Sequence, residues 1–179
     1  MPAPTTEGWE WLRIQEAPCP QCGLHPSTRA PADLGPAAVD AAAAWNRMLL
    51  AADPAALRTS PAPGVWNPMQ YAMHVRDMLR VFGERIELAV GADDPAVPWF
   101  DPGEDGRHGY TQAEPADAAA AIVEQSARFA GAVSTIRPGD WQRTVRRDGT
   151  DRFTVAGLAC FAVHEAHHHL LDAEGRLPR

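Results

Sequence analysis

An apolar segment near the C-terminus carries a cluster of histidines, and this combination constrains the fold more than any other feature of the chain. The run Val163-His164-Glu165-Ala166-His167-His168-His169 stands near the end of that segment. Residues four apart on a helix lie one turn apart on the same face, so His164 and His168 can bind one metal ion. The alternative is a solvated face, with cationic groups favoured near a helix C-terminus. The segment therefore predicts a bundle helix that carries part of a metal site.

A second strong helix supplies the best candidate for a third ligand. Asn67 is a good N-cap, Pro68 suits the first turn, and Gly91 suits the stop after Val90. His74 lies on this helix, in a sector that it shares with Tyr71 and Arg85. Three imidazoles, from His74, His164 and His168, would leave an open position for water or a substrate.

The remaining elements complete an all-α four-helix bundle. The patterns predict a helix over 37–52, another over 116–136, and a last helix that Thr154 caps and Gly175 stops. Asp148-Gly149 favours a hairpin turn before the last helix. Residues 93–110 form either a lid-like loop or an ordered surface crossing. The bundle domain is expected over 36–179, after a proline-rich, mostly irregular N-terminal arm over 1–35 that packs on it.

Charge and composition exclude several classes of function. The formal net charge of −7 argues against a nucleic-acid partner. All 16 basic residues are arginine, which excludes a catalytic lysine. No apolar run approaches the length of a membrane span, and the first residues do not resemble a signal peptide, so we expect a cytoplasmic protein without a membrane partner.

The arm contains a short group of residues typical of metal ligands: Cys19, Cys22 and His25. They supply at most three ligands, whereas a structural zinc site usually has four. The alternatives are a redox pair or two ordinary thiols. The sequence favours an arm held by packing of Trp9 and Trp11 over an arm held by a second metal.

Two separated motifs resemble the DinB-like superfamily. The segment from Trp66 to Asp77 is similar to its helix-two signature, and Phe153-Thr154-Val155 followed by His164-Glu165-Ala166-His167-His168 is similar to its helix-four signature. The resemblance implies a four-helix bundle whose metal ligands are His74, His164 and His168. Some members are transferases or isomerases that use mycothiol, bacillithiol or glutathione, and many others have no known activity.

Five further residues are candidates for roles around the metal. Cys160 (a ligand or nucleophile), His167 (a proton shuttle) and Asp77 (an orienting carboxylate) are the catalytic candidates. Tyr71 and Arg85 are the candidates for substrate binding. Each also has a structural interpretation as a packed, solvated or ion-paired side chain.

The leading functional hypothesis is a metal-dependent enzyme that acts on a small molecule. Zinc is the expected metal, with nickel and iron as alternatives. With a low-molecular-weight thiol at the open position the site would catalyse S-transfer, and with water it would catalyse hydrolysis. The rival hypothesis is a non-catalytic, stress-related metal-binding bundle, with a homodimer as its candidate assembly.

Overall fold

Four long helices form the body of the protein. The computed structural model describes residues 10–98, 100–101, 103–147 and 151–177. The long helices are α2 (Leu34–Ala51), α4 (Pro68–Gly91), α6 (Pro115–Ser134) and α7 (Val155–Ala173). Their packed faces enclose a core in which the largest fully buried side chains include Trp45, Phe82, Phe129, Ile86, Ile122 and Leu158. The expected four-helix bundle is confirmed.

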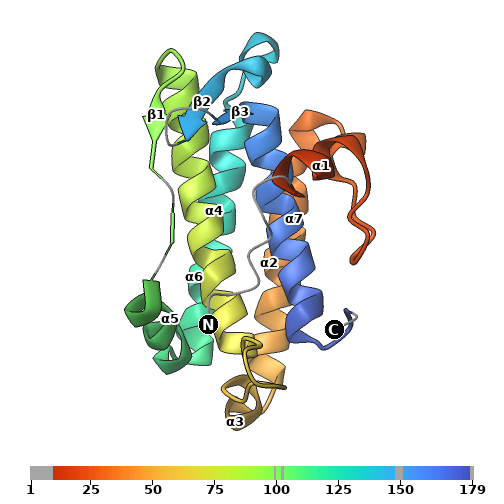
Figure 1. Cartoon of the computed structure of the whole chain (residues 1–179), viewed down its shortest axis with the longest axis vertical. Coiled ribbons are helices and arrows are strands. Elements are labelled where there is room, and N and C mark those ends of the chain that lie inside the picture. Colours follow the sequence, from red (N-terminus) through yellow and green to blue (C-terminus); the bar gives the residue numbers. More distant parts are fainter. Residues whose placement is uncertain (1–9, 99, 102, 148–150, 178–179) are drawn as a thin grey trace.

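The helices are not arranged around the bundle in chain order. Helix α2 packs against α6 and α7, and α4 packs against the same two helices, so α2 and α4 lie diagonally opposite (Figure 1). Helix α7 also contacts α1 (Glu10–Glu16) in the N-terminal arm. Because α7 has neighbours on three sides, it is buried along most of its length, which explains its continuous apolar sequence.

Local capping fixes the two helices that carry the candidate donors. In α4, the Asn67 side chain accepts from the backbone N–H of Gln70, and the Gln70 side chain accepts from the backbone N–H of Asn67. In α7, the Thr154 hydroxyl accepts from the backbone N–H of Gly157. Helices α4 and α7 therefore both begin at the positions that their cap residues predict.

A small sheet covers one end of the bundle (Figure 1). Strand β2 (Thr144–Arg147) pairs antiparallel with β3 (Asp151–Thr154) and parallel with β1 (Ala96–Val97). The expected hairpin is present, although its turn residues Asp148-Gly149 lie outside the described residues. The described part of residues 93–110 is a crossing that contains β1 and the start of α5 (Gly103–Gln112).

The shorter elements belong to the arm and the connections. They are α3 (Pro54–Leu57) and the 3-10 turns η1 (Pro26–Thr28), η2 (Pro31–Asp33) and η3 (Pro138–Gln142). The arm was expected to be mostly irregular, but its described residues contain α1, η1 and η2, and Ile14 of α1 enters the core. Trp9 lies outside the described residues and the side chain of Trp11 is not described, so their packing stays a prediction. Among the described residues, no helix is both long and apolar enough to cross a membrane.

Candidate metal centres

Helix α7 contributes to three groups of potential metal donors among the described residues; one of them, His168 with His169 and Asp172, lies within α7, and the other two each include residues of another part of the chain. His164 and His168 are four residues apart, and so are Glu165 and His169. Each pair therefore lies on one face, and the two faces differ by about 100°. The first pair faces the N-terminal arm, and the second pair faces His74 on α4.

In the set that faces α4, His74, Glu165 and His169 offer donor atoms that all lie within 4.8 Å of one another. Glu165 Oε2 is 3.2 Å from His74 Nε2 and 3.2 Å from His169 Nε2. Donors that share one ion at about 2.1 Å in tetrahedral geometry are separated by about 3.4 Å, so this spacing fits a shared metal. We call this group the His–Glu–His site.

Aromatic side chains and a second carboxylate support the His–Glu–His site. The Tyr71 ring stacks on His169 with centroids 5.1 Å apart, and Trp66 lies edge-on to His74 at 5.3 Å. His169 Nδ1 lies 2.9 Å from Asp172 Oδ2, so the carboxylate can accept a hydrogen bond from Nδ1–H, and Nε2 is the nitrogen that faces the potential metal position. The side chains of His74, Glu165 and His169 are 16%, 9% and 18% exposed, so the site is reachable from solvent.

The electrostatics of this site keep its carboxylate ionised. Burial opposes the charge, but the histidines around Glu165, first of all His169, hold its pKa well below its usual range. Burial also opposes charge on His169, yet Glu165 and Asp172 raise its pKa to about 9. Burial lowers the pKa of His74. Glu165 and His74 are therefore in the protonation states that a divalent cation requires, whereas His169 would release a proton when the cation binds.

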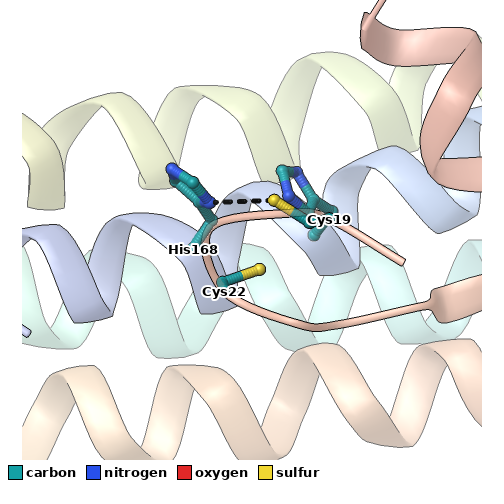
Figure 2. Close-up of side chains that lie close together, drawn as sticks. Cys19, Cys22 and His168 are labelled. Carbon is teal, nitrogen blue, oxygen red and sulfur yellow. Dashed lines mark hydrogen bonds between the residues drawn. The ribbon is translucent and has the colours of Figure 1, made fainter. Parts of the chain in front are cut away.

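The second set joins the arm to α7. One donor atom from each of Cys19, Cys22, His164 and His168 lies within 4.8 Å of the others. Cys19 Sγ is 3.7 Å from His168 Nδ1, and Figure 2 shows both thiols over the face of α7 that carries His168. We call this group the Cys–His site. Although burial raises the pKa of the Cys19 thiol, the backbone of Cys22 and the His164 side chain lower it below its ordinary value.

The structure thus divides the expected three-histidine set between two places. His74 groups with Glu165 and His169, whereas His164 and His168 group with the cysteines. The physical reason is the rotation of about 100° per helical residue, which turns His164 and His168 away from α4. The sequence signal for the other pair was present, because Glu165-x-x-x-His169 has the same four-residue spacing as His164-x-x-x-His168.

The catalytic candidates lie outside both sites. Cys160 is part of the core, where burial raises its pKa to about 11. Half-buried His167 belongs to none of the donor groups of the described residues. Asp77 accepts a short hydrogen bond from the Tyr110 hydroxyl and pairs with Arg76 at 2.7 Å, and its charge acts on His74.

The substrate-binding candidates differ in their relation to the His–Glu–His site. Tyr71 is part of its wall through the ring of His169. Arg85 donates to the carbonyl of Pro98 at 2.5 Å and so holds the crossing segment against α4. His25, the expected partner of the cysteines, is not in the Cys–His site, and its buried Nε2 has no hydrogen-bond partner among the described residues.

Comparison with known proteins identifies the family. Residues 37–173 match the model of the DinB superfamily. The chain belongs to the DinB superfamily. Among solved structures, this DinB-superfamily chain is similar to YfiT from Bacillus subtilis, described as a probable metal-dependent hydrolase with an unusual four-helix bundle topology. The TM-score is 0.74 at 17% identity, over 82% of this chain and 85% of YfiT, which shows a shared fold. No curated protein matches the sequence.

Proposed function

We propose that the protein is a metal-dependent enzyme whose metal is held by His74, Glu165 and His169. The observation that carries the proposal is the convergence of two imidazoles and one buried carboxylate from α4 and α7. Two histidines and a glutamate are a donor set of catalytic zinc sites, and two histidines with a carboxylate also suit iron. Zinc is the metal that we propose first.

The number of protein ligands supports a catalytic role over a purely structural one. The donor group contains three residues among those that the structure describes, which leaves a coordination position for water or a thiol. A divalent metal bound there would act as a Lewis acid and favour the anionic form of that water or thiol at neutral pH. The non-catalytic alternative would require a fourth ligand that closes the site.

The surrounding residues have separable roles in this proposal. Asp172 holds the His169 ring in the orientation and tautomer that direct Nε2 toward the metal. Tyr71 and Trp66 form an apolar wall beside the two histidines, which restricts the access of water and offers a surface for a small organic substrate. Asp77 lies near His74, and its negative charge stabilises the partial positive charge that the imidazole gains when it binds a cation.

Hydrolysis and S-transfer remain the two proposed reactions, and they differ in the group that attacks the substrate. Hydrolysis has the support of the similar fold of YfiT, which is described as a probable hydrolase. S-transfer would draw on a low-molecular-weight thiol of the cytoplasm, the proposed location. Because YfiT, which shares the fold, is described as a probable hydrolase, hydrolysis is the reaction that we favour.

Metal analysis of His74→Ala and Glu165→Gln, in protein without a histidine tag, tests the proposal. We expect each variant to lose the metal of this site and its activity in a screen of esters, amides and epoxides with and without thiols. His167→Ala is the matched control, because it removes a histidine of α7 outside both sites. Full metal content and unchanged activity in both variants would refute the assignment.

A further inference from the structure

We propose that Cys19, Cys22, His164 and His168 bind a structural zinc ion that fastens the N-terminal arm to α7. This site is separate from the proposed catalytic one and does not depend on the activity. It also replaces the sequence-based expectation of an arm held by packing alone. The donor set, two cysteines and two histidines, is one of the common sets of structural zinc sites.

The local backbone presents the two thiols together. Gly23 N donates to Cys19 O at 2.8 Å and Cys19 N donates to Leu24 O at 2.9 Å, which closes a tight turn around Cys19-Pro20-Gln21-Cys22. Gly23 has φ of 73°, a conformation that glycine adopts without strain.

The geometry of the group suits a tetrahedral ion. With zinc–sulfur and zinc–nitrogen bonds of about 2.3 Å and 2.0 Å, a sulfur and a nitrogen on one tetrahedral ion lie about 3.5 Å apart. The distance from Cys19 Sγ to His168 Nδ1 is 3.7 Å. All four donor atoms lie within 4.8 Å of one another. Small side-chain rotations therefore suffice to bring the set onto one ion.

The buried imidazole of His164 provides a second, independent observation. His164 is 7% exposed, and neither of its ring nitrogens makes a hydrogen bond among the described residues; Nδ1 has Glu165 Oε1 at 3.5 Å, beyond a good hydrogen bond. A buried polar group without a partner is costly, and a bound metal would satisfy one of these nitrogens. On the far side of His168, Nε2 lies 3.5 Å from Asp172 Oδ2, which places a carboxylate behind the ligand.

Four protein ligands close the coordination sphere, so the site has a structural rather than a catalytic role. Its effect falls on the arm. Ile14 enters the core, and the Gln15 side chain lies so close to Gly157 that a Cβ there would meet it at 2.8 Å. With zinc bound, the turn that follows α1 is fixed to the middle of α7, and α1 is held in this contact.

The first test uses cobalt in place of zinc in the full chain, purified with a reductant and without a histidine tag. We expect thiolate-to-cobalt charge-transfer absorption and the intense visible bands of a tetrahedral ion. Cys19→Ser with Cys22→Ser should remove these bands, whereas His74→Ala should retain them. Cys160→Ala, which removes the buried third thiol, should also retain them. A wild-type spectrum without thiolate charge transfer would overturn the proposal, even if the double variant fails to fold.

The second test counts metal and measures the order of the arm. Wild-type protein should hold one more zinc per chain than the double serine variant, and chelation should increase amide exchange in residues 10–24. A Cys19–Cys22 disulfide as the native state would contradict the proposal. If His74→Ala loses metal but keeps the thiolate–cobalt bands, the two sites bind metal independently. Each assignment can then fail without affecting the other.

Discussion

Asp172 contacts one histidine of each site. Its Oδ2 lies 2.9 Å from His169 Nδ1 and 3.5 Å from His168 Nε2. Glu165 makes a similar connection, because it lies between His74 and His169 while its Oε1 is 3.5 Å from His164 Nδ1. Two carboxylates of α7 therefore connect the donor sets, and a change at either one should affect both sites.

Asp172→Asn tests this connection at a single residue. The amide keeps the shape of the side chain but lacks the charge that orients His169 and increases the basicity of Nε2. We expect metal affinity at the His–Glu–His site to fall by about 10- to 100-fold, measured by competition with a chelator. Glu174→Gln is the control, since Glu174 pairs with Arg176 at the end of the helix. Equal affinities of Asp172→Asn and wild type would contradict the role.

The sequence predicts which histidines share a face of α7, but it does not predict the direction of that face. The four-residue spacing of His164 and His168 correctly placed them on one face of a helix. The direction of that face depends on how α7 is rotated between α2, α4 and the arm, which the spacing does not contain. Glu165 has the same spacing to His169, but carboxylates are common on helices that bind no metal, so this spacing alone does not indicate a ligand.

At the scale of elements, Asp94 connects the segment after α4 to both strands of the hairpin. It accepts from the Thr144 hydroxyl at 2.5 Å and from Arg152 Nε at 3.0 Å, and it pairs with Arg146 at 3.1 Å. Asp94 has φ of 43°, in a region that aspartate and asparagine tolerate better than most residues. The carboxylate therefore fixes the crossing segment to the sheet.

Asp94→Asn should destabilise the protein in a pH-dependent manner. The Thr144 hydroxyl, with Arg152 and Arg146, lowers the pKa of Asp94 below its ordinary value of about 3.9. A lowered native pKa means that the stabilisation is present above the unfolded-state pKa and is lost as the pH falls through the native one. Urea unfolding should show a deficit at pH 7 that disappears on acidification. Asp93→Asn is the neighbouring control, and a deficit independent of pH would contradict the explanation.

Gly35 marks the close approach of α2 and α6. A Cβ at this position would lie 3.1 Å from the backbone Cα of Ala130, so a larger side chain forces the helices apart. We expect Gly35→Val to lower the free energy of unfolding by about 1–3 kcal/mol, measured by denaturant titration. Gly131→Ala, which meets nothing within 4 Å, should instead stabilise α6 by up to about 1 kcal/mol. Equal effects of the two changes would refute the packing argument.

The boundaries of the long helices could be predicted because their signals are local. Asn67-Pro68 and Thr154 mark N-termini through their own side chains, and Gly175, with φ of 67°, marks the end of α7. By contrast, the crossing over residues 93–110 had no such signal. Strand β1 exists because β2, some 50 residues later, supplies its hydrogen-bond partner. The residues next to β1 in the sequence do not indicate that contact.

At the scale of the whole molecule, helix order distinguishes this bundle from a simple up-and-down arrangement. The count of helices follows from their patterns, but the diagonal placement of α2 and α4 follows from how their faces pack. This placement brings α7 between α2 and α4 and leaves its remaining side for the arm. The arrangement explains why one helix can face both α4 and the arm with donor residues.

The Cys–His site has a topological consequence. Cys19 and His168 are 149 positions apart, so an ion that binds both converts most of the chain into a closed ring. By the relation used for disulfide cross-links, a ring of this size removes about 5 kcal/mol of chain entropy from the unfolded state at 25 °C. The thiols emerge from the ribosome before any long helix, and the histidines emerge with the last one. Only a chain whose synthesis has passed α7 could therefore bind zinc with all four ligands. A product truncated before α7 would retain two exposed thiols.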